Sequence, residues 1–485
     1  MSSEYSVINS NTVSSWDRET DVLVVGMGAA GSAASITARE TGASVLVLDR
    51  ASGPGGTTAA AAGHIYMGGG TRVQKAVGIE DTVEDMYQYM LANTPDPDEE
   101  KLRLYCEGSV AHFDWLVERG VPFKDSIYPE KDVLQMTDDC LIESGNEAAW
   151  PYRNLAKPSV RGHKVEMVGD VGGSKLIEKL VAHAEKIGVE IQYDSAVTAL
   201  VRDGDRIVGV RCKTFDGEKF VGASGGVVLA AGQFGMNEKM IKDNCRLLGD
   251  DRIQKQGSTF DDGAGHQLGA AAGGVLDHMD GALLTSPFYP PQQLIYSILV
   301  NKHGKRFINE DVYHSKSSIA CLDQPDSVAY LIADDGFFAR PAYGWQEVVD
   351  AWETVEEMER DLNMPEGSLQ KTIDDYNSYA ENGDDKEFHK QAKWMKPLAN
   401  PPFAAVNMSL GEAQYVGFPL GGLRVTKDGE VLREDGSIVT GLFAAGGCAS
   451  NIAQDGSGYS SGTCIGESTF FGRRTGIRAA AGNTR

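Results

Sequence analysis

A glycine-rich turn near the N-terminus is the first segment whose residues suit a defined chemistry, the binding of a diphosphate. The letters GMGAAG occupy residues 26–31 and follow the apolar run DVLVV. In such a turn Gly26 permits the sharp bend, Gly28 lets the backbone approach a pyrophosphate, and Gly31 lets a helix pack closely on a strand. Asp49 ends the next apolar run, SVLVLD, where its carboxylate can accept hydrogen bonds from ribose hydroxyls. We therefore expect a dinucleotide-binding βαβ unit here.

Further small-residue segments favour FAD over a nicotinamide dinucleotide. GGTT follows the second strand at residues 55–58, AAG ends another apolar strand at residues 230–232, and GLFAAGG covers residues 441–447. TCIG at residues 463–466 opens a helix whose first amides could stabilise negative charge on a reduced flavin ring. A purely structural helix start is the competing interpretation. The expected FAD-binding residues are Gly26, Gly28, Ala30, Gly31, Asp49, Arg50, Gly56, Thr57, Thr58, Ala231, Gly232, Gly446, Thr463 and Ile465.

Charge and composition narrow the range of partners. The formal net charge of -24 repels nucleic acid and anionic lipid, so neither is expected as a partner. No apolar run approaches the roughly 18 residues of a membrane span, and the first residues lack the basic start of a signal peptide. We therefore expect a cytoplasmic protein without stable membrane insertion. The seven cysteines lack C-x-x-C spacing and the nine histidines lack metal-ligand spacing, so we expect reduced thiols and no metal.

The order of predicted elements indicates an α/β chain with two interleaved domains. Residues 1–20 are expected to form a loose leader before the first strand. Aromatic residues and prolines become common from residue 279 to residue 404, where helices are expected near residues 345–362 and 367–382. We expect this segment to be an inserted domain, with residues 1–278 and 405–485 forming the cofactor-binding domain on either side of it.

Five motifs together resemble the fumarate reductase and ketosteroid dehydrogenase superfamily of flavoproteins. They are DVLVVGMGAAG, GGTTAAAAGH, VVLAAGQFG, KRFINED and GLFAAGG, and they extend over nearly the whole chain. The resemblance implies a Rossmann-type, glutathione-reductase-like FAD-binding domain interrupted by an α+β catalytic domain, with substrate held between that domain and the flavin. Because His64 follows the phosphate-binding turn instead of preceding it, the FAD is expected to be non-covalent.

Two departures separate this chain from the fumarate reductases of that superfamily. Those enzymes carry a proton-donating arginine five residues beyond the asparagine of R-F-x-N-E, whereas Asn309 is followed at that distance by His314. They also carry a glutamate after A-A-G and then an H-G-x-N-R run. Here Gly447 stands at the first place and DGSGYSSG, residues 455–462, at the second. The positive charges that would hold a dicarboxylate are therefore missing.

The residues that stand at these two places resemble those of the 3-ketosteroid Δ4-dehydrogenases, which desaturate the A ring beside the ketone. Tyr313 after RFINED and the pair Tyr459 and Ser461 in GYSSGT carry this resemblance, and the Y-P-G-P-G-type stretch of the Δ1-dehydrogenases is absent. The resemblance implies FAD-dependent oxidation of a 3-ketosteroid to a 4-ene-3-one. A quinone-like molecule is expected to accept the electrons.

Desaturation beside a ketone requires a polarised carbonyl, a base for the C4 proton and a hydride acceptor for C5, which flavin N5 supplies. Tyrosine, with an ordinary pKa of about 10, is a poor base unless a hydroxyl relay assists it. Our hypothesis is that Tyr459, assisted by Ser461, takes the proton, and that Tyr313 binds the steroid and shares the proton network. A backbone amide near Gly462 would hold the 3-keto oxygen. Which tyrosine is the base stays open, as does a purely structural role for either.

Three other functions fit parts of the sequence. One is an enoate or fumarate-type reductase of the same superfamily, and another is a 3-ketosteroid Δ1-dehydrogenase. A third, from a different class, is a flavin subunit that passes electrons within a complex, which should expose a large apolar patch to its partner. The sequence contains no haem, iron-sulfur or flavin-linking motif that would favour the third.

Overall fold

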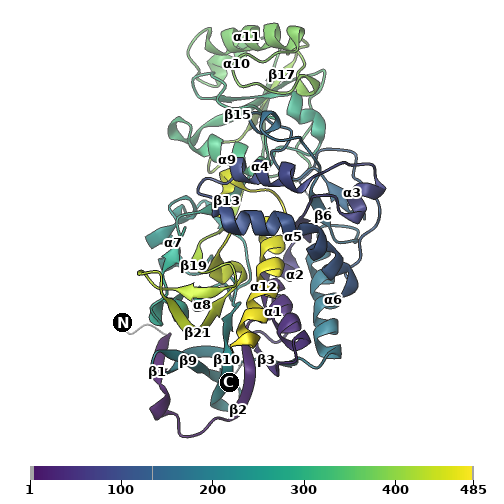
Figure 1. Cartoon of the computed structure of the whole chain (residues 1–485). Coiled ribbons are helices and arrows are strands. Elements are labelled where there is room, and N and C mark those ends of the chain that lie inside the picture. The colour runs from purple at the N-terminus through teal and green to yellow at the C-terminus, as the bar shows by residue number, and fades with distance from the viewer. Residues whose placement is uncertain (1–4, 134, 483–485) are drawn as a thin grey trace.

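A nine-stranded sheet forms the base of the computed structural model, which describes residues 5–133 and 135–482 (Figure 1). Five of its strands run parallel in the order β7-β3-β2-β10-β21. The second half of β2, residues 22–25, and the whole of β3 are buried, which is why both are continuous apolar runs in the sequence. The nine strands are β1 Ser6–Asn9, β2 Arg18–Val25, β3 Val45–Leu48, β7 Glu190–Gln192, β8 Ala196–Asp203, β9 Arg206–Thr214, β10 Gly217–Leu229, β20 Glu430–Leu432 and β21 Ile438–Ala444.

Strand β10 belongs to two parts of this sheet. Its first half pairs antiparallel with β9, and its second half runs parallel to β2 and β21, with a register shift between Ala223 and Gly226. A side chain at Gly226 would lie 2.6 Å from the Phe443 ring, so only glycine fits there. The expected loose leader is wrong for the described residues, because β1 pairs with β8 and β2 already begins at Arg18.

Helices α1 Ala29–Glu40 and α12 Thr463–Ala481 pack side by side against the parallel strands, and α6 Gly172–Lys186 lies next to α1 (Figure 1). Their close approach depends on small residues. A Cβ atom at Gly472 would lie 2.6 Å from the Ala30 carbonyl oxygen, and one at Gly476 would lie 2.1 Å from that of Ala34. Glycine here brings the start of α12 close to the glycine-rich turn at the start of α1.

A four-stranded antiparallel sheet lies at the opposite end of the molecule (Figure 1). Its strands, in spatial order, are β14 Ile298–Asn301, β15 Ala329–Asp334, β17 Phe403–Asn407 and β16 Val348–Trp352. Helices α10 Val355–Asp361 and α11 Ser368–Asn382 share a hydrophobic core with this sheet. A continuous helix over residues 345–362 was expected, and this is wrong in its first half. The β-branched Val348 and Val349 extend the sheet as β16, and Thr354 then caps a new helix.

Smaller elements connect the two sheets. Helices α4, α5 and α9 and strand β13 of the three-stranded sheet β11-β18-β13 lie between them (Figure 1). No helix among the described residues is both long and apolar enough to span a bilayer. The remaining elements are α2 Gly56–Ala60, α3 Arg72–Ala76, α4 Val83–Asn93, α5 Glu99–Glu118, α7 Glu238–Asn244, α8 Ala264–Ala271, α9 His314–Leu322, β4 His64–Tyr66, β5 Leu141–Ile142, β6 Gly162–Lys164, β11 Ile253–Lys255, β12 Leu276–Asp277, β13 Ala282–Thr285, β18 Tyr415–Pro419, β19 Gly422–Arg424 and β22 Ala449–Ser450.

Candidate active site

A cavity of about 720 Å³ extends from the glycine-rich turn of α1 to the loop that precedes α9. Its volume lies in the upper part of the range of about 300 to 1,000 Å³ that is usual for ligand sites. Helix α2, strand β18, the start of α12 and a strap formed by residues 254–261 supply most of the rest of its wall. The cavity is therefore long enough to combine a nucleotide-binding end with a second, apolar end.

Glycine is required at the turn because other residues would block it. Gly26 has a φ of +102°, and a Cβ atom there would lie 2.4 Å from the carbonyl oxygen of Ala230. At Gly28 the nearest atom to such a Cβ is 3.7 Å away, so the approach from the cavity stays open. Gly31 does not line the cavity; a Cβ there would lie 1.9 Å from the Gly26 carbonyl oxygen, so Gly31 serves helix packing.

Asp49 and Arg50 line the same end of the cavity. The Asp49 carboxylate accepts hydrogen bonds from the amides of Met27, at 2.7 Å, and Ala51, at 2.8 Å. Burial raises its pKa, and these amide bonds oppose the rise. Arg50 forms an ion pair of 2.6 Å with Asp262. Asp49 thus holds the backbone around the site, and Arg50 ties this end of the cavity to Asp262.

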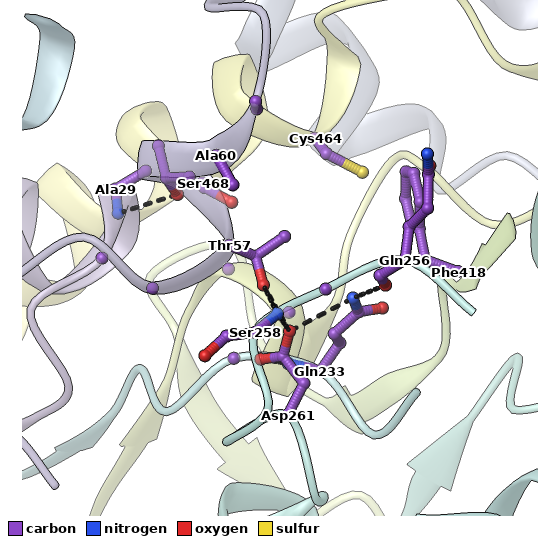
Figure 2. Close-up of a pocket in the computed structure, with 18 of the residues that line it drawn as sticks. Ala29, Thr57, Ala60, Gln233, Gln256, Ser258, Asp261, Phe418, Cys464 and Ser468 are labelled. Atoms are coloured by element: carbon purple, nitrogen blue, oxygen red, sulfur yellow. Dashed lines mark hydrogen bonds between the residues drawn. The ribbon is translucent and has the colours of Figure 1, made fainter. Parts of the chain in front are cut away.

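A polar network missed by the sequence analysis crosses the middle of the cavity (Figure 2). The Asp261 carboxylate accepts a hydrogen bond from the Thr57 hydroxyl and another, at 2.9 Å, from the Ser258 amide. Gln233 donates to it from its backbone amide and its side chain, at 3.3 Å each. The hydroxyl of Thr57, one of the expected FAD-binding residues, therefore connects α2 to the strap. No motif in the sequence indicated this partner.

The start of α12 closes the other side of the cavity. Gly462 has a φ of +97°, and a Cβ atom there would lie 2.5 Å from the Tyr66 amide nitrogen. Within the described chain, no protein group accepts the amide hydrogens of Gly462 or Ile465, and both residues line the cavity. The positive end of the helix dipole therefore faces the cavity. Thr463 does not line the cavity; its hydroxyl donates to the Ser460 carbonyl oxygen at 2.8 Å.

The three predicted catalytic residues meet at the apolar end of the cavity. The hydroxyl oxygens of Tyr313 and Ser461 are 2.7 Å apart, and the rings of Tyr313 and Tyr459 lie 6.3 Å apart. The expected relay from Tyr459 to Ser461 is not the bond that forms, because Ser461 bonds to Tyr313 instead. The Tyr459 hydroxyl accepts the amide hydrogen of Cys464 at 3.2 Å. Burial raises the pKa of both tyrosines above the ordinary value.

The surroundings of the tyrosines are hydrocarbon-like. Tyr313 and Tyr459 form one buried cluster with Leu283 and Leu420, against which Phe418 packs. Among the described residues that line the cavity, the cationic side chains are Arg50, which pairs with Asp262, and Lys255, which donates to the Asp250 carbonyl oxygen. This end of the cavity therefore suits an apolar ligand and lacks the charges that would bind a dicarboxylate.

Two histidines add polar atoms to this wall. His64 and His314 line the cavity, both are more than nine-tenths buried, and the Nε2 atom of each lacks a hydrogen-bond partner. Burial lowers the pKa of His64 to about 4 and that of His314 to about 3, so both rings are neutral at physiological pH. Buried polar atoms without partners are rare in folded proteins, and those that face a cavity indicate the position of a ligand.

Comparison with known proteins agrees with this geometry. The family described as FAD binding domain matches residues 21–462 of the chain. The chain belongs to this FAD-binding family. The glycine turn, the carboxylate of Asp49 and the free amides at the start of α12 fit the diphosphate, the ribose and the electron-accepting ring of FAD, respectively. The protein is thus an FAD-dependent oxidoreductase of the fumarate reductase and steroid dehydrogenase superfamily.

Several relatives of the flavoprotein are known. It is 43% identical to the 3-ketosteroid-Δ4-(5α)-dehydrogenase of Rhodococcus jostii RHA1, solved in complex with 4-androstene-3,17-dione, with a TM-score of 0.91 over 97% of this chain and 99% of that one. It is 26% identical to the 3-oxo-5-alpha-steroid 4-dehydrogenase of Comamonas testosteroni, over 89% of this chain and 93% of the relative. It is 29% identical to the NADH:fumarate oxidoreductase of Klebsiella pneumoniae (strain 342), where 95% of this chain spans 47% of the relative.

Most of the residues predicted from the sequence of the flavoprotein face one cavity, and Gly31 and Thr463 are the two that do not. The residues that sequence reasoning missed come mainly from the strap and from the apolar end. The sequence indicated them only through its composition, because the strap is rich in polar residues and β18 contains aromatic residues. These missed residues are His64, Gln233, Gln256, Ser258, Phe260, Asp261, Leu283, Thr285, His314, Phe418, Leu420, Cys464 and Glu467.

Proposed function

We propose that the flavoprotein is a 3-ketosteroid Δ4-(5α)-dehydrogenase that converts a saturated 3-ketosteroid to the 4-ene-3-one. The observation that carries the proposal is the hydroxyl pair of Tyr313 and Ser461 beside Tyr459, inside an apolar cluster. A fused-ring ketone needs hydrocarbon walls and a few hydroxyl groups at one end, and the cavity offers both. The relative from Rhodococcus jostii RHA1, solved with a steroid, supports the same substrate class.

In this mechanism Tyr459 polarises the ketone. Its hydroxyl oxygen accepts the Cys464 amide hydrogen, and its own hydrogen, which faces the Cys464 thiol, would be donated to the 3-keto oxygen when a steroid is bound. The unpaired amide of Gly462 supplies a second donor nearby. Donors that are fixed before the reaction stabilise the negative charge that develops on this oxygen as the C4 proton leaves. The raised pKa of Tyr459 keeps it protonated for this role.

Tyr313 and Ser461 remove the C4 proton. The proton passes to the Ser461 oxygen while the Ser461 hydrogen moves to Tyr313, whose hydroxyl proton is released to solvent. Such a relay avoids a stable tyrosinate, which burial disfavours because it raises the pKa of Tyr313. FAD held by the glycine turn and the start of α12 would supply the acceptor for the hydride that leaves C5, so the steroid would lose one proton and one hydride in total. A quinone-like acceptor would then reoxidise the flavin.

The alternative of a fumarate-type reductase lacks its binding groups in this cavity. Arg50 and Lys255, the cationic side chains among the described lining residues, are engaged with Asp262 and the Asp250 carbonyl. A dicarboxylate left without cationic partners in an apolar cavity is strongly disfavoured.

A substrate panel tests the proposal. The FAD-bound protein is incubated with an artificial electron acceptor and, separately, a 5α-3-ketosteroid, a 4-ene-3-one and succinate, and the products are identified by mass spectrometry and NMR. We expect a 4-ene-3-one from the first substrate only. A 1,4-diene from the second would indicate Δ1 chemistry, and fumarate from the third would indicate a dicarboxylate enzyme; either result alone would overturn the assignment.

A further inference from the structure

The two catalytic segments of the proposed dehydrogenase come from different parts of the chain. Tyr313 directly precedes α9, whereas Tyr459 and Ser461 precede α12. Their hydroxyl groups can exchange a proton only if the spacing between the two segments is kept constant to within roughly a few tenths of an ångström. A third segment, the loop of residues 144–147 after β5, contacts both of them.

Asn146 in this loop joins the two catalytic segments through its side chain. Its Oδ1 atom accepts the backbone amide hydrogen of Tyr313 at 2.8 Å. Its Nδ2 group donates to Oδ1 of Asn93 at 3.2 Å, and the Asn93 side chain in turn donates to the carbonyl oxygen of Gly458, which precedes Tyr459. Two asparagines thus connect the backbone at one catalytic tyrosine to the backbone at the other.

The backbone of the same loop makes a second connection. The Asn146 amide donates to the Tyr89 hydroxyl at 2.8 Å, and that hydroxyl is 2.8 Å from the Ser460 hydroxyl. The Ser144 carbonyl oxygen accepts the amide hydrogen of Ser461 at 2.7 Å. Ser461 is therefore fixed both through its own backbone and through its neighbour, by the same loop whose Asn146 side chain holds the Tyr313 backbone.

The loop has no room to shift. Asn146 is fully buried, and Tyr89, Asn93 and Ser460 are at most 5% exposed. A Cβ atom at Gly145 would lie 2.5 Å from the Ser460 hydroxyl oxygen and 2.7 Å from that of Tyr89, so the loop packs directly against these groups. Asn146 itself is not part of the cavity wall. Any effect it has on the reaction must therefore pass through the catalytic residues.

We propose that Asn146 is a positioning residue that sets the distance between the hydroxyl groups of Tyr313 and Ser461, an inference that rests on the proposed dehydrogenase function. Without its side chain, the Tyr313 amide and the Asn93 side chain each lose a buried partner. The two catalytic segments then move relative to each other, and proton removal slows while FAD and steroid still bind.

The test compares Asn146→Ala and Asn93→Ala with Asn377→Ala in the FAD-bound protein. Asn377 is the matched control, because its side chain also holds backbone groups: it donates to the Leu398 carbonyl oxygen and accepts the Leu398 amide hydrogen. It lies in α11, which packs on the four-stranded sheet and not on the cluster that contains the two tyrosines. We expect Asn146→Ala to lower kcat about 10- to 100-fold with KM changed by less than about 3-fold. The kinetic isotope effect of deuterium at C4 should rise, because proton transfer becomes the slower step. Asn93→Ala should give a smaller loss with the same isotope signature.

Two outcomes would overturn the positioning role. One is a kcat within about 2-fold of wild type for both asparagine variants, and the other is a loss that Asn377→Ala reproduces with no change in the C4 isotope effect. Should Asn146→Ala fail to fold, Asn93→Ala still decides between these results. A crystal structure of the FAD-bound variant separates this inference from the proposed function. If wild type oxidises no 3-ketosteroid, the function fails, but a lengthened distance between Tyr313 Oη and Ser461 Oγ would still support positioning and an unchanged distance would refute it.

Discussion

The hydroxyl oxygens of Tyr313 and Ser461 lie 2.7 Å apart although the residues are 148 positions apart in the chain. This contact joins the loop before α9 to the start of α12, and it faces the apolar end of the cavity. Because burial raises the pKa of Tyr313, the pair is neutral at rest and can act only by passing a proton along. Substitutions in this pair, in Tyr459 beside it and in the glycine turn therefore have distinct expected effects.

Tyr459→Phe should lower kcat for 3-ketosteroid oxidation about 100- to 1,000-fold, the usual cost of removing one donor to a developing oxyanion. The phenylalanine keeps the apolar packing against Phe418 and Tyr313, so FAD content and thermal stability should change little. Tyr376→Phe is the control, because that buried hydroxyl donates to the Tyr296 carbonyl oxygen away from the site. Equal activity in the two variants would remove Tyr459 from the reaction.

Tyr313→Phe and Ser461→Ala should each lower kcat about 100- to 10,000-fold, since each interrupts the same proton relay. The double variant should then be no slower than the worse single variant, because the second change removes nothing that is still working. Steady-state kinetics of the three proteins measures this coupling. Losses that multiply in the double variant would mean that the two hydroxyl groups act independently.

The rate of oxidation should rise with pH. The pKa of Tyr313 lies above its ordinary value of about 10, so the neutral form dominates in the accessible range and each increase in pH favours loss of the proton. We expect kcat/KM to increase from about pH 6 to about pH 10 without a plateau, whereas Tyr313→Phe should flatten the profile. A wild-type plateau near neutral pH would point to another base, such as one of the cavity histidines.

Gly26→Ala should prevent FAD binding. The new Cβ atom would lie 2.4 Å from the Ala230 carbonyl oxygen, so the turn must open where the diphosphate binds. Gly42→Ala is a matched control, because Gly42 has a similar φ of +98° but no atom within 4 Å of an added Cβ. Both variants carry the strain of a positive φ, and only the first should lose the yellow colour of the purified protein. Full FAD content in Gly26→Ala would contradict the assignment of this turn.

Stability should fall in mild acid. Burial lowers the pKa of His64, His163 and His266 to about 4, below the ordinary histidine value of 6.5. As the pH falls below 6.5, these histidines bind protons in the unfolded chain but stay neutral in the folded chain. The free energy of unfolding is therefore highest above pH 6.5 and decreases as the pH falls toward 4. Each histidine contributes a slope of up to about 1.4 kcal/mol per pH unit in this window.

Glu467 opposes this trend. Its pKa is raised to about 7, so its contribution is largest in acid and is lost as the pH rises toward 7. The pKa values of Asp49, Glu147, Asp261 and Glu387 are raised as well, so these carboxyl groups act in the same direction as Glu467. Five buried histidines with lowered pKa values act against them, and we expect the net effect between about pH 6.5 and about pH 5 to follow the histidines. Urea unfolding followed across this pH range checks the sign, and His266→Gln should reduce the slope whereas exposed His303→Gln should not. A protein that becomes more stable as the pH falls from 6.5 would contradict these pKa directions.

The nucleotide-binding end could be predicted from the sequence because its demands are local. Gly26 and Gly31 are required by the conformation and packing of one short turn, and each requirement leaves a residue type in the sequence. The apolar end depends on contacts between distant segments. The bond from Ser461 to Tyr313, in place of Tyr459, and the bond from Thr57 to Asp261 arise only when separate parts of the chain pack together.

The elements show the same division between local and distant effects. Helices α1 and α12 have local signals, in their starts and in their small residues, and both were expected from the sequence. Strand β16 occupies a segment that the sequence analysis placed in a helix, and it forms because β17 offers an edge to pair with. Strand β1 likewise exists through its pairing with β8, which lies far along the chain.

The proposed reaction is tested most directly by anaerobic mixing of the purified, FAD-bound protein with a 5α-3-ketosteroid such as 5α-androstane-3,17-dione, while the visible absorbance of the flavin is recorded. We expect rapid bleaching of the flavin together with formation of one equivalent of the conjugated 4-ene-3-one. Bleaching should slow strongly in Tyr313→Phe. Two results would contradict the proposed Δ4 chemistry. One is a flavin that stays oxidised with this steroid but is bleached by a 4-ene-3-one, and the other is a flavin that no steroid bleaches.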